Sequence, residues 1–318
     1  MKNSQKDTET RGNAELIHFE AERFRSNSVD YIIGVDEAGR GPLAGPVVAA
    51  SCCFVGDPKE SMNISEIRDS KLITDEKERE IIYEKIINHP KCLWDVSIQS
   101  NIVIDEINIL QATMKAMHSA TSELLHKHSH VLKGKKILAL IDGNRVPEDM
   151  PCESKSVIKG DSLAYSISAA SVLAKVTRDR IMNKLHQTYP LYGFDQHKGY
   201  PSPSHRMVLS EIGPCPEHRV SYRPVREAAE KHGNKLLLSR AVTIDARKLE
   251  TAAAKSGNTL SSPKRKGRKG AVKDTTPVKT SRQSLKKLPI PVEKLGAIFD
   301  SSESPKKVKS RKSSCSIL

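Results

Sequence analysis

The chain has 318 residues, of which 37% are apolar, and it carries a formal net charge of +14 at pH 7. Residues 233–318 hold 21 Lys and Arg against 6 Asp and Glu, whereas residues 1–232 hold 31 against 32. A uniformly basic nucleic-acid-binding domain is therefore excluded, and any such contact in the near-neutral first part depends on how its charges are arranged locally.

Simple patterns disfavour several other classes of protein. No apolar run approaches the roughly 18 residues needed to span a bilayer, and the N-terminus lacks the apolar core of a secretory signal peptide. The cysteines form neither a C-x-x-C pair nor a cluster with zinc-ligand spacing. They are Cys52, Cys53, Cys92, Cys152, Cys215 and Cys315. Reduced thiols and an intracellular location are expected.

The first predicted elements form a hairpin. Residues 1–28 are a polar N-terminal extension, after which Tyr31–Val35 is expected to be a buried strand that ends at Asp36 and Glu37. A glycine-rich loop follows, and its prolines exclude a helix there. The apolar run Val47–Val55 has a suitable length for an antiparallel partner strand.

Helices and strands then alternate along the chain. Thr74, followed by Asp75 and Glu76, is expected to begin a helix, because it can cap the N-terminus and the acidic residues suit the positive end of the helix dipole. The later elements are a strand over Leu93–Ile98, a helix over Ile104–Leu125, a strand over Ile137–Ile141 that ends at Asp142, and a helix over Ser162–His186. This order predicts an α/β layered domain with a central mixed sheet flanked by helices.

The last third of the chain divides into two parts. Gly193–Pro224 is predicted to form loops and short helices that cover the domain. From residue 233 the chain is rich in Lys, Ser and Pro, a composition that cannot bury enough apolar surface to offset the chain entropy. The predicted organisation is an extension over residues 1–28, a folded domain over 29–232 and a basic disordered tail over 233–318.

Acidic residues follow two of the buried strands. Asp36 and Glu37 lie where an apolar strand meets a glycine-rich loop, and Asp142 ends another strand. Strand ends are where α/β sheets place chemistry, and carboxylates that converge there persist only with cations between them. Oxygen ligands select a hard ion such as Mg²⁺ or Mn²⁺. A single Asp after a strand is as often a helix cap or a turn residue, so Asp36 alone proves nothing.

These acidic residues belong to a longer set of ordered motifs. The set comprises Asp36-Glu37-Ala38-Gly39-Arg40-Gly41, Asp69-Ser70-Lys71-Leu72, Ile141-Asp142-Gly143-Asn144, Lys159-Gly160-Asp161, Ser168–Ser171, Ala174-Lys175, Arg178-Asp179 and Gly193–Pro201. In this order the motifs resemble the type 2 RNase H family, and in particular the single-chain ribonuclease HII, over Tyr31–Val225. The resemblance implies an RNase H-like layered fold whose folded domain is catalytic and acts without a partner subunit.

The resemblance also implies a reaction. The family's four metal-binding carboxylates fall on Asp36, Glu37, Asp142 and Asp161, which with two Mg²⁺ or Mn²⁺ ions would hydrolyse a phosphodiester to leave 5′-phosphate and 3′-hydroxyl ends. The implied substrates are the RNA strand of RNA–DNA hybrids and ribonucleotides embedded in duplex DNA, which are nicked on their 5′ side. The implied roles are the removal of such ribonucleotides and of RNA primers. Asp179 is the alternative to Asp161 and is interpreted instead as part of a helix ion pair.

The substrate-binding residues follow from the same resemblance. Gly39-Arg40-Gly41 would contact the ribose, because glycines let the backbone approach the 2′-hydroxyl and arginine can grip phosphate. Without the resemblance, a tight turn with a solvated arginine explains this triplet equally well. Tyr200 would stack on the following deoxyribose, where the alternative is a core tyrosine. Phosphates would be held by Ser70, Lys71 and, as a weaker candidate, Lys198.

Three features of the tail predict partners. Its two Lys/Arg clusters indicate nuclear import or a nonspecific DNA tether rather than a merely solvated tail, so the protein would be nuclear in a eukaryote and cytoplasmic otherwise. An apolar island of Leu295, Ile298 and Phe299 resembles a degenerate sliding-clamp peptide that lacks the usual glutamine. Cys315 begins a four-residue prenylation pattern after a polybasic stretch, which would anchor the protein to a membrane.

Two rival functions remain open at this point. A nucleic-acid-binding subunit could keep the fold and lose catalysis, although acidic residues stand at all four expected positions. A different two-metal nuclease, such as a resolvase or an integrase-like relative, could share the layered sheet. Neither Gly39-Arg40-Gly41 nor Tyr200 supports that second alternative.

Overall fold

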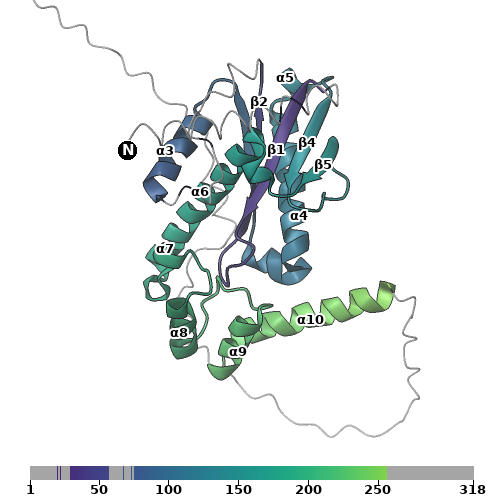
Figure 1. The fold of residues 1–318 in the computed structure, drawn as a ribbon. Coiled ribbons are helices and arrows are strands. Elements are labelled where there is room, and N and C mark those ends of the chain that lie inside the picture. The colour runs from purple at the N-terminus through teal and green to yellow at the C-terminus, as the bar shows by residue number, and fades with distance from the viewer. Residues whose placement is uncertain are drawn as a thin grey trace, which may run out of the picture. The chain divides into compact units, whose positions relative to one another are not determined.

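The computed structural model describes residues 20, 22, 29–56, 67, 73 and 75–255, with side chains as far as residue 246. Five strands form one sheet in the order β3-β2-β1-β4-β5 (Figure 1). The strands are β1 (Tyr31–Ala38), β2 (Val47–Phe54), β3 (Cys92–Gln99), β4 (Ile137–Asp142) and β5 (Glu153–Val157). The hairpin β1–β2 and the pair β2–β3 are antiparallel, whereas β4 is parallel to both β1 and β5. The expected mixed sheet is confirmed.

Two long helices cover the opposite faces of this sheet, α4 (Asn101–Lys127) and α6 (Tyr165–Thr188) (Figure 1). Alternate residues of β2 face opposite sides, as the pleat of a strand requires. Val48 and Ala50 pack in one apolar cluster with α6, and Ala49 and Cys53 in another with α4. The sheet is therefore buried on both sides, which is why β1, β2 and β4 are almost continuously apolar.

Helix α6 lies unusually close to β1. A Cβ added to Gly34 would lie 2.1 Å from the carbonyl carbon of Ser166, so only glycine allows this approach. The small side chains of α6, including Ala169 and Ala170, are fully buried against the sheet. This close packing sets the end of β1 beside the start of α6.

The segment after α6 forms the predicted cover of loops and short helices. Its elements are η2 (Pro190–Tyr192), α7 (Phe194–His197), α8 (Pro203–Ile212) and α9 (Arg223–Lys231). This cover holds the loop that joins β1 to β2 from both sides. Leu43 N–H donates to Gly199 O at 2.8 Å, Gly45 N–H donates to Glu217 O at 3.0 Å, and Arg219 N–H donates to Leu43 O at 2.8 Å.

Several predicted boundaries are wrong. Strand β1 does not end at Asp36 but continues to Ala38, because Asp36 and Glu37 still pair with β2. Helix α3 (Glu76–Ile87) is capped by Asp75, which accepts a hydrogen bond from Lys77 N–H at 2.9 Å, and β5 was not expected at all. Its five residues are largely exposed and polar, so they carry no apolar signal.

The largest correction concerns the boundary at residue 232. A helix, α10 (Lys235–Lys255), occupies the start of the segment predicted to be disordered. Its residues Leu237, Ala241 and Ile244 form an apolar cluster with Val220 and Ala229 of the preceding cover. The composition of residues 233–318 as a whole concealed this amphipathic helix of 21 residues. The rest of that tail lies outside the described residues.

One residue of the predicted N-terminal extension belongs to the core. Glu20 is fully buried, and its Oε1 accepts hydrogen bonds from Ser166 N–H at 2.6 Å and Ser166 Oγ at 2.5 Å, at the first turn of α6. Burial raises the pKa of Glu20 to about 7. The extension therefore contributes at least this contact to the folded domain.

None of the helices in the described part of the chain is both long enough and apolar enough to cross a membrane.

Candidate metal centre

Three carboxylates from distant parts of the chain meet at one end of the sheet. Asp36 lies near the end of β1, Asp142 is the last residue of the adjacent parallel strand β4, and Asp161 lies in the short turn η1 (Gly160–Ser162) just before α6. One oxygen from each lies within 4.8 Å of the others. Among the described residues this is the acidic group with metal-ligand geometry.

This cluster is electrostatically costly without a cation. Burial raises the pKa of Asp36 well above its ordinary value, and the charges of Glu37 and Asp142 raise it further. Hydrogen bonds from the Ser171 side chain and from Glu37 N–H, the latter at 2.7 Å, oppose this effect without cancelling it. A donor set made only of carboxylate oxygens fits a hard divalent ion such as Mg²⁺ or Mn²⁺.

Glu37 lies beside this cluster, and its carboxylate is bound to Arg40. Its Oε1 accepts a hydrogen bond from Arg40 Nη1 at 3.2 Å, and it lines the same cavity as Asp36 and Asp142. Burial raises the pKa of Glu37 while the Arg40 guanidinium lowers it, with the net shift upward. The fourth expected ligand is therefore adjacent to the three-carboxylate group rather than part of it.

A tight turn sets the position of Asp161. Lys159 adopts a left-handed conformation with φ of 57°, and the next backbone N–H, that of Gly160, donates to Asp142 Oδ1 at 2.7 Å. A Cβ on Gly160 would lie 2.5 Å from Ile167 Cδ1 and 3.3 Å from Asp142 Oδ1, so a larger residue would displace the Ile167 side chain. Ser168 Oγ donates to the Asp161 carbonyl. These contacts tie the third carboxylate to the second.

Asp179, the alternative to Asp161, does not join the cluster. Its Oδ1 accepts a hydrogen bond from Lys175 Nζ at 2.8 Å, one turn earlier on α6, in a largely buried ion pair. The helix ion pair expected for Asp179 is present.

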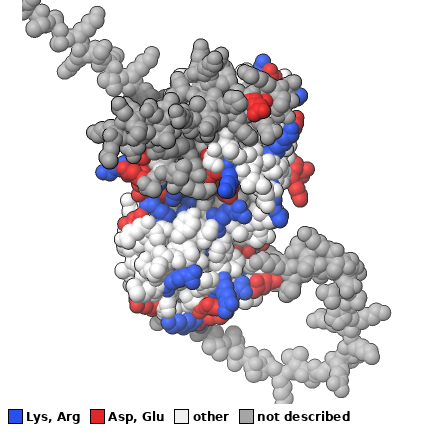
Figure 2. Space-filling view, viewed as in Figure 1, with Lys and Arg blue, Asp and Glu red and all other residues white. Residues whose placement is uncertain are grey.

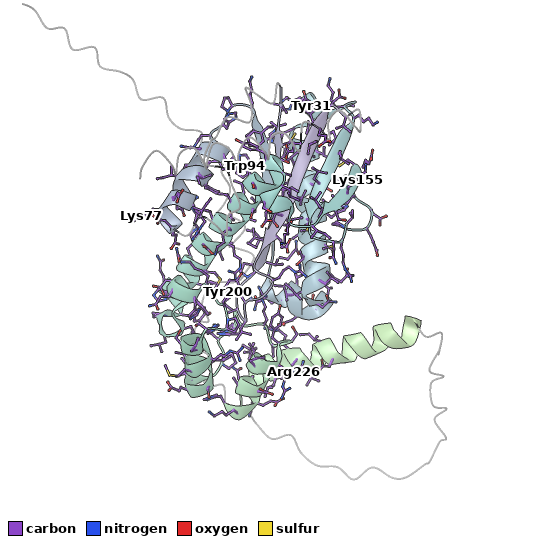
Figure 3. The ribbon with its side chains drawn as sticks, viewed as in Figure 1. Tyr31, Lys77, Trp94, Lys155, Tyr200 and Arg226 are labelled. Carbon is purple, nitrogen blue, oxygen red and sulfur yellow. The ribbon has the colours of Figure 1, made fainter. Side chains whose placement is uncertain are left out.

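The predicted recognition residues line the same cavity as the carboxylates. The cavity has a volume of about 250 Å³, and its walls include Gly39, Arg40, Gly41 and Tyr200. The Tyr200 side chain is 43% exposed and lies against the loop, since a Cβ on Gly41 would be 3.4 Å from its ring. In Figure 3 Tyr200 lies between the sheet and helices α8 and α9. The structure thus brings loop, tyrosine and carboxylates together.

Two buried arginines hold the loop, and the sequence interpretation missed both. Arg219 donates to the carbonyls of Gly39 at 2.6 Å, Arg40 at 3.0 Å and Gly45 at 3.0 Å. Arg178 donates to Pro46 O at 3.0 Å and reaches across to Lys198 O at 3.0 Å. Burial lowers the pKa of Arg178 to about 10. The motif Arg178-Asp179 includes one of these arginines, but a motif does not reveal that the guanidinium binds backbone carbonyls.

Two cavity residues were also not predicted as site residues. Ser171 and Lys175 line the cavity from α6, and their spacing of four residues on the helix was the available signal.

The candidate phosphate-binding residue Lys198 is buried. Its ammonium donates to Asn183 Oδ1 at 2.7 Å and to Asp195 O at 2.5 Å, so it is a structural contact. The remaining predicted positions lie outside the described residues; they are Ser70, Lys71, Leu295, Ile298, Phe299 and Cys315.

The face shown in Figure 2 carries charges of both signs. Figure 2 shows Lys and Arg side chains crossing the middle of the displayed face, with Asp and Glu interspersed around them. This agrees with the near-neutral balance of residues 1–232. Phosphate contacts there depend on local cations rather than on net charge.

Comparison with known proteins identifies the family. A family model described as Ribonuclease HII matches residues 33–225. The chain is 47% identical over 199 residues to the Ribonuclease HII of Xanthomonas oryzae pv. oryzae, covering 63% of this chain and 74% of that one. It is 48% identical over 203 residues to the Ribonuclease HII of Polynucleobacter necessarius subsp. necessarius, covering 64% and 98%. Bst-RNase HIII, solved in complex with Mn²⁺, shares the fold with a TM-score of 0.51 at 16% identity, covering 64% of this chain and 70% of that one. The chain therefore belongs to the ribonuclease HII family of RNase H enzymes, endonucleases that degrade the RNA of RNA–DNA hybrids.

Proposed function

We propose that this enzyme also nicks duplex DNA on the 5′ side of a single embedded ribonucleotide and leaves 5′-phosphate and 3′-hydroxyl ends. The observation that carries the proposal is that Gly41 and Tyr200 line the same cavity as Asp36 and Asp142. A ribose read by the loop would place its phosphate within reach of the carboxylates. Recognition and hydrolysis would then occur on one nucleotide.

The carboxylates Asp36, Glu37, Asp142 and Asp161 are the proposed catalytic and metal-binding residues. Bound divalent cations, Mg²⁺ or Mn²⁺, would supply a nucleophile at neutral pH and stabilise the departing 3′ oxygen. The chain's own part is to hold the oxygens of Asp36, Asp142 and Asp161 within 4.8 Å before any ion binds.

The loop Gly39-Arg40-Gly41 is proposed to read the 2′-hydroxyl through its backbone. In a trans peptide the carbonyl and the following N–H point in opposite directions, and this structure has no cis peptide among its described residues. Because Arg219 binds the carbonyls of Gly39 and Arg40, it turns the N–H groups of Arg40 and Gly41 away from itself. Backbone donors held in this way suit a ribose hydroxyl, which is both donor and acceptor.

Tyr200 is proposed to stack on the deoxyribose that follows the ribonucleotide. Its half-exposed ring beside Gly41 supports this role, since a core tyrosine would be buried. The contact would favour a 5′-RNA–DNA-3′ step over continuous RNA.

One gel tests the proposal. A duplex with a lone ribonucleotide and a long RNA–DNA hybrid are each incubated with the protein, with and without Mg²⁺ or Mn²⁺, beside an all-DNA duplex and an all-RNA duplex as controls. We expect a single metal-dependent nick on the 5′ side of the ribonucleotide and no cleavage of the controls. Cleavage of the hybrid alone, with the single-ribonucleotide duplex left intact, would refute the proposal. Binding without cleavage under every metal condition would instead favour a non-catalytic binding subunit.

The cellular role follows from that specificity. We propose that the enzyme removes misincorporated ribonucleotides and RNA primers, in the nucleus of a eukaryote or otherwise in the cytoplasm. A sliding clamp is the proposed partner of the island Leu295, Ile298 and Phe299, and retention on clamp resin tests it. Prenylation of Cys315 is tested by intact-mass measurement of the protein from its own host.

A further inference from the structure

Three histidines form a network directly behind Tyr200. His205 and His218 are fully buried, and their Nε2 atoms lie 3.0 Å apart. His205 Nδ1 lies 2.9 Å from the Tyr200 carbonyl, and His218 Nδ1 lies 3.1 Å from Cys215 N. The ring of His197 stacks on that of His205, with centroids 4.4 Å apart and planes 12° apart.

The hydrogen-bond partners at the two ends of the pair determine its protonation. A carbonyl only accepts, so His205 Nδ1 must carry a proton to bond with Tyr200 O, and in the neutral ring its Nε2 is then an acceptor. The acceptor Nε2 of His205 needs a donor, so His218 carries its proton on Nε2 and its Nδ1 accepts from the Cys215 N–H. The Cys215 carbonyl, 3.3 Å from the same Nδ1, accepts instead from the backbone N–H of His218 at 3.1 Å. Each ring therefore has one tautomer that satisfies its contacts.

An additional proton on either ring would break this chain of bonds. It would set two N–H groups against each other at 3.0 Å, or leave the Cys215 N–H facing another donor. Burial lowers the pKa of His205 to about 4 and that of His218 to about 3, in agreement with two neutral rings. The third ring is fixed in the same way, since His197 Nδ1 accepts from Gly199 N–H at 3.2 Å and its Nε2 lies 2.7 Å from Tyr192 O.

The backbone at Tyr200 depends on such support. Lys198 and Gly199 both adopt left-handed conformations, with φ of 49° and 81°, so the turn that presents Tyr200 is strained at a non-glycine residue. Arg178 Nη1 donates a hydrogen bond to the Lys198 carbonyl at 3.0 Å. His205 Nδ1 donates one to the Tyr200 carbonyl, two residues later. The ring direction of a half-exposed tyrosine follows from how its backbone is held.

We propose that His205 is a positioning residue for Tyr200, kept in its Nδ1–H tautomer by His218, and that this pair sets the enzyme's preference for a ribonucleotide followed by DNA. The inference rests on the proposed function of Tyr200. It assigns to the histidines no contact with substrate and no proton transfer. Their effect is on the geometry of the stacking surface and therefore on substrate choice.

Two amide variants of one residue separate the two contacts. Asn places its amide where His carries Nδ1, so His205→Asn keeps a donor to Tyr200 O and loses the contact with His218. Gln reaches the Nε2 position, so His205→Gln keeps the contact with His218 and loses the donor to Tyr200 O. The readout is the ratio of kcat/KM on a single-ribonucleotide duplex to kcat/KM on a long RNA–DNA hybrid.

We expect His205→Gln to lower this ratio about fivefold to tenfold, the size of one net hydrogen bond, mainly by raising KM on the single-ribonucleotide duplex. His205→Asn should stay within about twofold of the wild type. In a Tyr200→Ala background, His205→Gln should change the ratio no further, because both changes act on the same contact. His218→Gln, which keeps a donor toward His205, and His218→Asn, which loses it, repeat the comparison at a second site if a His205 variant does not fold.

The outcomes separate this inference from the proposed function. If the wild type cuts the single-ribonucleotide duplex and Tyr200→Ala impairs that cutting, an unchanged ratio in both His205→Gln and His218→Asn overturns the inference alone. A further loss on adding His205→Gln to Tyr200→Ala overturns it too, because the histidine would then act independently of the tyrosine. A wild-type enzyme that ignores the single ribonucleotide, or a Tyr200→Ala variant with equal losses on both substrates, overturns the proposed function and this inference with it.

Discussion

At the scale of single residues, the three-carboxylate group is a place where function opposes stability. Asp36, Asp142 and Asp161 lie close together in a largely buried setting, where burial raises the pKa of Asp36 and the charges of Glu37 and Asp142 raise it further. Asp179, on helix α6, is also a buried aspartate, but it forms an ion pair with Lys175. The charge of Asp142 therefore lowers the stability of the folded protein, whereas that of Asp179 raises it. The two residues form a matched pair for substitution by Asn.

Asp142→Asn should abolish cleavage with Mg²⁺, since it removes a ligand charge, while it raises the melting temperature of the metal-free protein by relieving repulsion. The amide oxygen can still accept the hydrogen bond from Gly160 N–H, so the turn at Asp161 is kept. Asp179→Asn should do the reverse, with cleavage retained and the melting temperature lowered. Nuclease assays and thermal melts in EDTA check both variants, and normal cleavage by Asp142→Asn would show that the metal centre is assigned wrongly.

The neutral histidine pair predicts a pH dependence of stability. The folded-state pKa values of His205, about 4, and His218, about 3, lie below the ordinary value of 6.5. The unfolded chain therefore binds more protons in this range, so the stability from the neutral rings is present above pH 6.5 and is lost as the pH falls toward 4. The melting temperature of the wild type relative to His218→Gln, which does not titrate, should fall between pH 7 and pH 4. A pH-independent difference would contradict the assignment of neutral rings.

At the scale of elements, the site exists because of two adjacencies. Strands β1 and β4 are parallel neighbours, and Val35 pairs with Ile141. The next residue of each strand, Asp36 and Asp142, therefore lies at the same end of the sheet. Helix α6 packs against β1 at Gly34, which brings the turn before the helix, and Asp161 with it, to that edge. The cover after α6 then closes on the β1–β2 loop, and α10 in turn supports the cover.

Truncation tests the role of α10. A chain that ends at residue 232 loses the buried side chains of Leu237 and Ile244 and exposes Val220. It also leaves Asp105 without the Arg240 hydrogen bond, which is 2.8 Å long. The loss of apolar burial alone is roughly 3–6 kcal/mol of unfolding free energy. A chain that ends at residue 255 should match the full-length melting temperature in urea or thermal denaturation, and equal stability of the two truncated chains would contradict a structural role for α10.

At the scale of the whole molecule, charge is divided between the folded domain and the tail. Residues 256–318 hold 16 Lys and Arg against 4 Asp and Glu, whereas residues 1–232 are close to neutral. The domain carries the carboxylate cluster, and the tail carries most of the excess Lys and Arg. We expect ion binding by the domain and salt-sensitive nucleic-acid binding by the tail to be separable properties.

Divalent ions should stabilise the folded protein. A ligand that binds only the native state adds about 2.7 kcal/mol when its free concentration is 100 times its Kd. Thermal melts with increasing Mg²⁺ or Mn²⁺ should therefore show a rising melting temperature, and Asp142→Asn should remove most of the rise. An identical rise in wild type and variant would mean that the ions bind elsewhere.

Removing the tail should change the salt dependence of the reaction and leave the chemistry intact. A chain that ends at residue 255 should show a higher KM at low salt, a kcat near that of the full chain and a shallower slope of log(kcat/KM) against log[salt], because fewer counterions are released on binding. The measurement is a kinetic series across salt concentrations. An unchanged slope would indicate that the tail does not contact nucleic acid.

Much of this protein could be predicted from local sequence. The apolar strands, the long helices and the mixed sheet follow from periodicity and from residues next to one another in the chain, and the ordered motifs identify the family. The errors have local causes as well. Strand β5 has a weak apolar signal, and the apolar residues of helix α10 are diluted in a long basic segment, so pairing with β4 and packing on Val220, rather than composition, decide their structure.

What only the tertiary structure decided is which distant groups share a space. Glu37 turns to Arg40 beside the three-carboxylate group, Arg219 binds loop carbonyls some 180 residues earlier, and His205 supports Tyr200. The sequence by itself determined the residue types and the order of the elements, because helix and strand periodicity are properties of neighbouring residues. Contacts between residues far apart arise from packing of the whole chain, and a linear pattern does not encode which buried donor meets which acceptor.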